Sequence, residues 1–177
     1  MKLITTFKII ASAAGVVLAT FSAGCGGGGG NGDGGEACFV ATQGDFTDYQ
    51  KWDAFDGGTV ANDGLGLDGA QRTIYINKVP SHGSKTFPVG TMIVKTTAGG
   101  VTFAMAMRGC DFNPPVGDWE WFELTPGTGD TPLISWRGTA PPAGNVYGGA
   151  LFTCNGCHSG FTANDYVGGS AAQLSQF

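Results

Sequence analysis

Cys154-Asn155-Gly156-Cys157-His158 decides how the rest of this chain is interpreted. The stretch has the form C-x-x-C-H, which is the attachment site of a c-type haem. Two thiols three positions apart reach the same edge of a porphyrin, where each adds to one vinyl group, and the next residue is a histidine that can ligate the iron. Asn155 and Gly156 are small and suit a tight loop against the ring. We therefore predict haem c attached to Cys154 and Cys157, with His158 as the proximal iron ligand.

Two other kinds of site use a C-x-x-C pair. A redox-active pair is typical of a βαβ context, which this sequence does not show. A structural zinc site needs two further ligands, and His82 is the only histidine outside the motif. Haem attachment is therefore the favoured interpretation.

The N-terminal residues 1–24 have the layout of a secretory signal peptide, with two lysines followed by an apolar run over residues 9–21. The stretch that ends at Cys25 resembles a bacterial lipobox, although Ser22 stands where leucine is usual. The alternative is a plain secretory signal that happens to precede a cysteine. We predict that Cys25 is lipidated.

Residues 26–35 are glycine except for Asn31 and Asp33, and the segment 25–37 is therefore predicted to be a flexible linker between the lipid and a folded domain. Gly26 rather than aspartate follows the cysteine, which favours the outer membrane by analogy with lipoprotein sorting. We expect a lipid-anchored protein of the periplasm or cell envelope that contacts the membrane through its anchor only.

The remaining cysteines predict a disulfide. Of the five cysteines, lipid takes Cys25 and haem takes Cys154 and Cys157. Cys38 and Cys110 are left over in an oxidising compartment, where disulfides persist. The alternative is a pair of buried free thiols.

Composition is consistent with one domain over residues 38–177 and argues against some partners. The sequence of 177 residues contains 14 acidic and 9 basic residues, so an acidic surface excludes nucleic acid as an expected partner. The 32 glycines indicate many loops and turns.

The pattern of apolar residues predicts an α+β fold, mainly an antiparallel sheet with a few helices. Aromatic residues spaced by three predict a helix over residues 45–55. β-branched and aromatic runs predict four strands and one short apolar stretch, over residues 72–77, 91–97, 101–107, 119–124 and 133–136. The strand at 119–124 is expected to place Trp119, Trp121 and Glu123 on one face.

The order of several motifs resembles the cytochrome P-460 and cytochrome c′-beta family, over about residues 45–170. The matching stretches are Arg72-Thr73-Ile74-Tyr75-Ile76, Phe87-Pro88-Val89-Gly90-Thr91, Lys95, Gly117-Asp118-Trp119-Glu120-Trp121-Phe122, the C-x-x-C-H motif and Asp165-Tyr166-Val167. The resemblance implies a homodimer whose subunits each hold one five-coordinate haem c in a cytochrome P-460-like sheet. It also implies binding or oxidation of nitric oxide or hydroxylamine at an open distal site.

The resemblance gives roles to three residues. Lys95 matches a lysine that is covalently linked to the porphyrin in the P-460 branch, and Arg72 matches a distal arginine able to donate to a propionate or a bound oxyanion. Lys95 and Arg72 are therefore the candidate catalytic residues, and Phe87 is a candidate wall of the distal pocket. The alternatives are a surface lysine, a solvent-facing arginine and a core phenylalanine.

One departure from the family weighs against fast catalysis. Enzymatic members place a carboxylate shortly before the haem motif, but no Asp or Glu lies between Asp130 and Cys154. Glu123 or Asp165 would have to replace it, because hydroxylamine oxidation needs a proton acceptor. We therefore rank nitric oxide binding or slow oxidation above fast hydroxylamine turnover.

The sixth iron ligand separates the functional classes. Met92, Met105, Met107 and His82 are the candidate sixth ligands, and a bound methionine would make the protein an electron-transfer cytochrome. The three methionines lie within expected strands rather than a late loop, so we expect an open site. A periplasmic electron-transfer partner is expected in either case. A third hypothesis is a structural lipoprotein whose haem only stabilises the fold.

Overall fold

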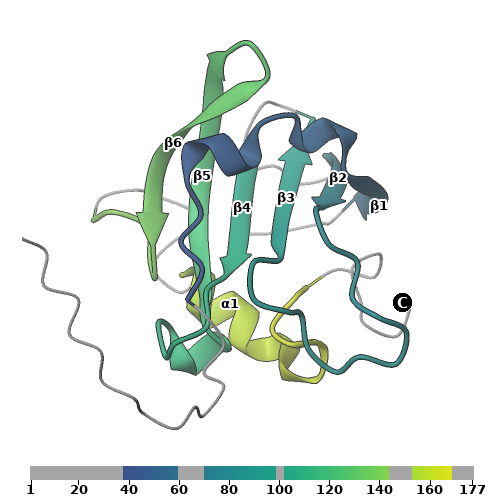
Figure 1. Ribbon diagram of the computed structural model, residues 1–177, viewed down its shortest axis with the longest axis vertical. Helices are drawn as coiled ribbons and strands as arrows, with labels where there is room; N and C mark the ends of the chain where they lie inside the picture. The colour runs from purple at the N-terminus through teal and green to yellow at the C-terminus, as the bar shows by residue number, and fades with distance from the viewer. Residues whose placement is uncertain (1–37, 60–69, 99–101, 144–152, 169–177) are drawn as a thin grey trace, which may run out of the picture. The chain divides into compact units, whose positions relative to one another are not determined.

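Six antiparallel strands form one sheet whose spatial order follows the sequence, from β1 to β6 (Figure 1). The computed structural model describes residues 38–59, 70–98, 102–143 and 153–168. The strands are β1 (Asp53–Thr59), β2 (Gln71–Ile76), β3 (Met92–Thr97), β4 (Thr102–Met107), β5 (Trp119–Thr128) and β6 (Thr131–Gly138). The helices are η1 (Gln43–Phe46), η2 (Tyr49–Lys51), η3 (Pro114–Val116), α1 (Cys154–His158) and η4 (Ser159–Asn164), all of the 3₁₀ type except α1.

The prediction of a mainly antiparallel sheet is confirmed, with β2, β3 and β4 close to the expected ranges. β5 and β6 are longer than expected and meet at a two-residue loop, where Thr128 pairs with Thr131. Gly129 in this loop has a φ of +61°, which glycine adopts without strain. A Cβ at Gly127 would lie 2.1 Å from the carbonyl oxygen of Thr131, so the close strand approach requires glycine there.

The predicted helix over residues 45–55 is wrong. This stretch forms η1, η2 and the start of β1, because Asp48 adopts a left-handed backbone with a φ of +59°. A spacing of three also matches the three residues per turn of a 3₁₀ helix better than the 3.6 of an α-helix. Phe46 and Tyr49 are thus buried by the 3₁₀ turns, whereas Phe55 belongs to the edge strand β1.

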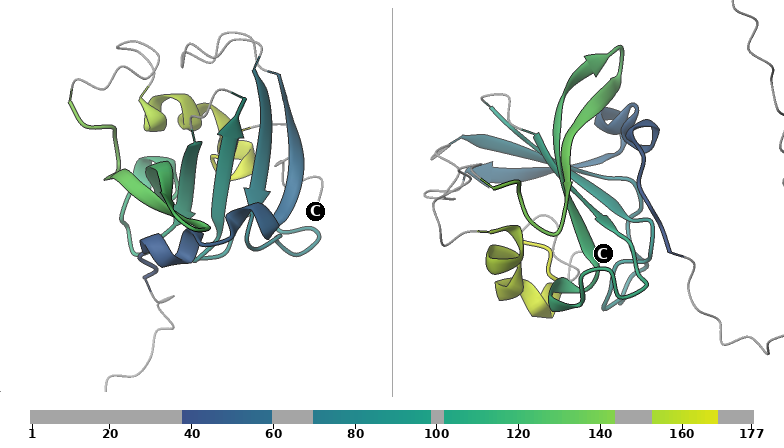
Figure 2. Two further views of the ribbon diagram at one scale, coloured as in Figure 1. Left: turned by 90° about the horizontal axis from the view of Figure 1, so that it is seen from above. Right: turned by 90° about the vertical axis from the view of Figure 1, so that its left-hand side faces the viewer.

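The two faces of the sheet carry separate cores. The first, which we call the motif face, contributes Ile74, Ile76, Ile93, Met105, Met107, Trp119, Trp121 and Trp136. The second, the N-terminal face, contributes Met92, Val94, Ala104, Ala106, Phe122 and Leu124. Figure 2 shows α1 and η4 on one side of the sheet and η1 and η2 on the other. The C-x-x-C-H motif in α1 therefore lies against the motif face, on the side of the sheet opposite η1 and η2.

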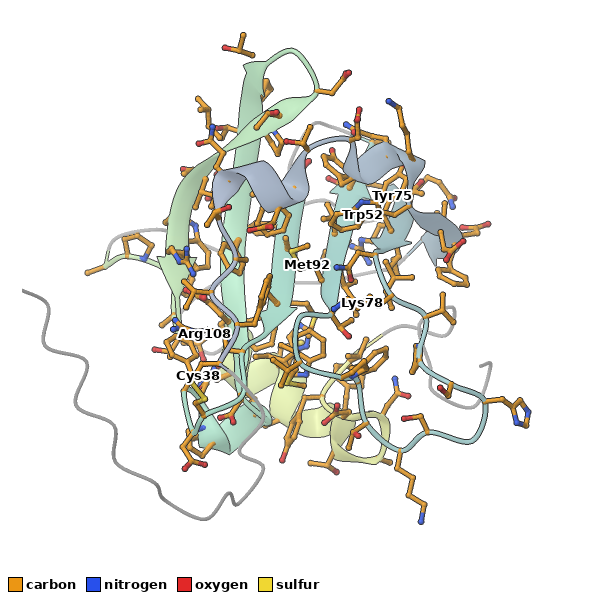
Figure 3. The ribbon with its side chains drawn as sticks, in the orientation of Figure 1. Cys38, Trp52, Tyr75, Lys78, Met92 and Arg108 are labelled. Atoms are coloured by element: carbon orange, nitrogen blue, oxygen red, sulfur yellow. A yellow bond between two sulfur atoms is a disulfide. The ribbon has the colours of Figure 1, made fainter. Side chains whose placement is uncertain are left out.

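The N-terminal face is closed by aromatic packing and by a buried ion pair. The rings of Phe46 and Phe122 meet edge to face at 5.2 Å, and Figure 3 shows Trp52, Tyr75 and Met92 on this side. Arg137 donates to Glu120 from Nε at 2.7 Å and from Nη2 at 2.6 Å. None of these residues belongs to the core on the motif face.

The predicted disulfide between Cys38 and Cys110 is present and joins residues 72 positions apart. Next to it in sequence, the backbone N–H of Phe39 donates to the carbonyl of Arg108 at 3.0 Å. Cys25, the predicted signal peptide and the predicted linker over residues 25–37 lie outside the described residues. Within the described ranges, no helix is long and apolar enough to cross a membrane.

Candidate haem-binding site

A short helix, rather than the expected loop, presents the C-x-x-C-H motif. Thr153 caps α1, because its Oγ1 accepts a hydrogen bond from the backbone N–H of Gly156 at 3.1 Å. Residues three and four apart lie on one side of a helix, so Cys154, Cys157 and His158 are neighbours. Both cysteines are free thiols. The helix therefore offers two thiols and an imidazole from one surface.

His158 is held in the tautomer that an iron ligand needs. Its Nδ1 lies 2.6 Å from the carbonyl oxygen of Tyr166, and a carbonyl only accepts, so Nδ1 carries the hydrogen. Nε2 is thereby left with its lone pair for a metal. Burial lowers the pKa of His158 to about 4, against the opposite effect of the hydrogen bond to Tyr166. The ring is thus neutral at physiological pH, as ligation requires.

Two aromatic rings flank His158. The ring of Trp121 lies 4.4 Å away between centroids, tilted by 42°, and that of Phe161 lies 6.1 Å away, edge to face. Trp121 belongs to β5 and Phe161 to η4, so the sheet and the helical segment both fix the imidazole.

Asn155 anchors the motif to the sheet, a role that sequence reasoning missed. Its Oδ1 accepts hydrogen bonds from Trp121 Nε1 at 2.6 Å and from Asn113 Nδ2 at 3.1 Å. Its Nδ2 donates to Asn113 Oδ1 at 2.9 Å, and Asn113 Nδ2 also donates to the carbonyl of Trp119 at 2.7 Å. Asn155 therefore connects the motif helix to β5 and to the loop before it through hydrogen bonds.

Asp165 ties the end of the helical segment to two parts of the chain. Its carbonyl accepts from Trp119 Nε1 at 2.8 Å, and its Oδ2 accepts from the backbone N–H of Phe87 at 2.7 Å. Burial raises the pKa of Asp165, and the hydrogen bond from Phe87 lowers it less. Phe87 is buried edge to face against Trp119 at 5.7 Å, so the structure places it in the core beneath the motif.

Lys95, in β3, lies on the motif face in a row of residues that crosses the sheet from β1 to β6. Residues directly opposite in antiparallel strands point to the same side. The row consists of Phe55, Ile74, Lys95, Phe103, Glu123 and Trp136. The Nζ of Lys95 lies 5.7 Å from the centroid of the Phe103 ring.

The positive charge of Lys95 acts electrostatically on two residues of the C-x-x-C-H motif. Its ammonium group lowers the pKa of His158, and it offsets part of the rise that burial causes in the pKa of Cys154, to about 11. Lys95 is half-buried, so the structure brings this predicted residue towards the motif rather than into open solvent.

Arg72 lies on the same face of β2, two residues before Ile74, and is opposite Thr97 in β3. Its side chain is only 5% exposed, which rules out a solvent-facing arginine. A Cβ at Gly57 would come within 3.0 Å of the Cβ of Arg72, so glycine in β1 makes room for it. A buried cation on the motif face suits an anionic group such as a propionate.

Glu123 supplies a carboxylate on this face. The indole Nε1 of Trp136 donates to its Oε2 at 2.8 Å. Glu123 and Lys95 stand on either side of Phe103 in the same row. Glu123 therefore brings a carboxylate to the motif face, although the stretch between Asp130 and Cys154 contains no Asp or Glu.

The candidate sixth ligands do not all lie on the same face of the sheet as the C-x-x-C-H motif. Met92 belongs to the N-terminal face, opposite to α1, and His82 is exposed in the loop between β2 and β3. Met105 and Met107 belong to the motif face but are packed in its core.

Two observations concern the alternative chemistries of the C-x-x-C pair. Among the described residues, no group of three or more His, Cys, Asp or Glu side chains is placed to hold a metal ion. Redox-active cysteines have lowered pKa values, whereas burial raises the pKa of Cys154.

Comparison with known protein families, curated proteins and solved structures found no match.

Proposed function

We propose that this protein is a mono-haem c-type cytochrome of the P-460 type, which binds or oxidises small nitrogen species at an open distal haem site. The observation that carries the proposal is the state of His158. Its Nδ1–H is committed to the Tyr166 carbonyl and its neutral Nε2 is left for iron, next to two free cysteines on the same helix. Two thiols and a neutral imidazole are the groups that haem c attachment requires, and they support the proposal.

Each described residue of the site has a separate role in this proposal. Cys154 and Cys157 hold the haem, which supplies iron for ligand binding and electron exchange. His158 ligates the iron, Asn155 fixes the helix, and Arg72 is a buried cation available to a propionate. Lys95 is the residue whose link to the porphyrin the resemblance implies.

The wider proposal follows from the sequence. It comprises a lipid anchor at Cys25, a location in the cell envelope, a homodimer and a periplasmic electron-transfer partner. Replacing Cys25 with alanine is expected to release the protein from membranes. An unchanged distribution in fractionated cells would reject the anchor without touching the haem proposal.

A six-coordinate electron carrier is the second candidate function. It requires a ligand on the motif face, and Met105 and Met107 are the described methionines there. Nitric oxide separates the two functions, because a saturated iron cannot bind it without losing a ligand.

The experiment uses mature protein from a host with the haem c maturation machinery. Mass spectrometry after denaturation is expected to show one added haem, and the Cys154→Ala and Cys157→Ala double variant none. The ferrous spectrum is expected to be high-spin and to shift with nitric oxide. A low-spin ferrous spectrum that nitric oxide leaves unchanged would favour the electron carrier, and a chain without covalent haem would reject both functions.

A further inference from the structure

The loop between β4 and β5 connects the Cys38–Cys110 disulfide to the C-x-x-C-H motif. We call residues 108–118 the bridging loop. It contains Cys110 and the short helix η3, and η3 lies against α1 and η4 at one end of the sheet (Figure 1). One segment of chain therefore carries half of the disulfide and also touches the motif.

The first part of the bridging loop is held in a demanding backbone conformation. Gly109, Cys110 and Asp111 are all left-handed, with φ values of +67°, +58° and +54°. Residues other than glycine adopt this conformation only where their surroundings enforce it. The Asp118 carboxylate helps, because it accepts the backbone N–H groups of Asp111 at 3.1 Å and of Asn113 at 3.0 Å. The disulfide adds the one covalent restraint, at Cys110 itself.

The bridging loop holds the motif helix through Asn113. The Oδ1 of Asn113 accepts a hydrogen bond from Asn155 Nδ2 at 2.9 Å, and its Nδ2 donates to Asn155 Oδ1 at 3.1 Å. Asn113 is 3% exposed, so little water competes for these bonds. The position of the loop therefore sets the position of the residue between the two motif cysteines.

The same loop also supports the turn that orients His158. A Cβ at Gly117 would lie 2.8 Å from the ring carbon Cδ2 of Tyr166, so the loop backbone is in close contact with this ring. The carbonyl of Tyr166 accepts the hydrogen on Nδ1 of His158. The bridging loop thus contacts the support of the proposed iron ligand as well as the support of the cysteines.

We propose that the Cys38–Cys110 disulfide completes the C-x-x-C-H site through the bridging loop, so that the site is redox-sensitive. Both cysteines are exposed, and a dithiol reductant would open their bond, giving two thiols while the reductant becomes a disulfide. Cys110 then loses its covalent restraint, and the loop releases Asn155 and Tyr166. The inference goes beyond the proposed function, because it concerns how the site is assembled and not what it binds. It places oxidation of Cys38 and Cys110 before haem attachment.

The test measures amide hydrogen exchange in the mature protein, by mass spectrometry of peptides. The peptide that spans α1 reports on the motif, and the β4 peptide reports on opening of the central sheet. Four proteins are compared: the unaltered chain, Cys38→Ser with Cys110→Ser, Asn113→Ala, and all three substitutions together. Val94→Ala is the control, since it opens a cavity in the N-terminal face away from the bridging loop.

Loss of the disulfide is expected to speed exchange in α1 about tenfold beyond any change in β4, as for the loss of one or two net hydrogen bonds. In the Asn113→Ala background the same loss should add about twofold or less, because the link to Asn155 is already cut. Val94→Ala should give α1 no increase beyond that in β4. Equal changes in α1 and β4, or the same increase with and without Asn113, would overturn the inference.

Two further measurements complete the test. Haem per chain in the disulfide variant is expected to fall several-fold during maturation, and a full complement of haem would overturn the proposed order of assembly. If that variant does not fold, the unaltered protein is titrated with dithiothreitol, and α1 exchange should rise with the fraction of Cys38–Cys110 reduced. A fully reduced protein with unchanged α1 exchange would overturn the inference. An unaltered protein without haem would reject the proposed function, whereas the exchange comparison would still decide this inference.

Discussion

The Nδ1 atom of His158 lies 2.6 Å from the carbonyl oxygen of Tyr166, so a backbone group eight residues away sets the tautomer of the proposed iron ligand. The chain returns to His158 because Asp165 and Tyr166 both adopt left-handed backbone conformations, with φ values of +50° and +63°. The turn after η4 is therefore part of the site, although neither side chain in it is a proposed ligand.

Asp165→Asn tests the cost of burying a carboxylate in this turn. Asparagine tolerates the left-handed conformation and keeps an acceptor for the Phe87 N–H. Because the folded pKa of Asp165 is raised, its contribution to stability is fully present below the unfolded pKa and is lost as pH rises through the folded pKa. The variant is therefore expected to gain stability relative to the unaltered protein as pH rises from about 3 to 7.

Urea unfolding at several pH values gives this difference directly. The difference between the two proteins is expected to be smallest in acid. A difference that does not vary with pH would contradict a raised pKa for Asp165.

Asn155→Ala is expected to destabilise the protein by about 1–3 kcal/mol, because it leaves the Trp121 N–H and the Asn113 amide without their partner. Ser159→Ala is the control, since it removes only an exposed hydrogen bond from the same segment. Thermal unfolding of both variants measures the effect. Equal melting temperatures would show that Asn155 does not anchor the motif.

Removal of the disulfide tests the closure of the N-terminal segment. Cys38→Ser together with Cys110→Ser opens a link across 72 positions, which is expected to cost about 2–5 kcal/mol, mainly through the unfolded state. Urea unfolding measures the loss, and reduction of the unaltered protein should reproduce it. A stable double variant whose midpoint is unchanged would be inconsistent with this account.

The central strands could be predicted from sequence because their side chains alternate between two buried faces. The split of Trp119 and Trp121 from Phe122 and Leu124 follows directly from this period of two. β1 could not be found in the same way, since Asp53–Thr59 contains two aspartates and two glycines, which disfavour strands. It forms a strand because β2 pairs with it, and that pairing is a tertiary effect.

The candidate site was predictable only where its residues are adjacent in sequence. The C-x-x-C-H motif carries its own spacing, but Asn155 meets Trp121 and Asn113 across 34 and 42 positions. The shared row of Lys95 and Glu123 likewise depends on the register of β3, β4 and β5. No local pattern fixes that register, so the carboxylate of the motif face could be named as a candidate but not placed.

Lys95→Met tests whether the lysine charge acts on the proposed haem site. The ammonium group already lowers the pKa of both His158 and Cys154, so it disfavours further positive charge there. Loss of this charge should stabilise the ferric over the ferrous state and lower the midpoint potential. Methionine keeps the length and apolar stem of lysine, so packing beside Phe103 is largely preserved.

The size of the shift follows from the partial exposure of Lys95. For an assumed separation of roughly 10 Å, a unit charge is worth about 1–2 kcal/mol at an effective dielectric constant of 20, and solvent screening reduces this. We therefore expect a potential lowered by a few tens of millivolts, where 59 mV corresponds to a tenfold change for one electron. Lys85→Met, in the exposed loop between β2 and β3, is the matched control and should leave the potential unchanged. A covalent link between Lys95 and the porphyrin would instead give a large spectral change and a lysine–haem peptide by mass spectrometry. Equal potentials in the Lys95 and Lys85 variants, with unchanged spectra, would show that Lys95 does not act on the haem.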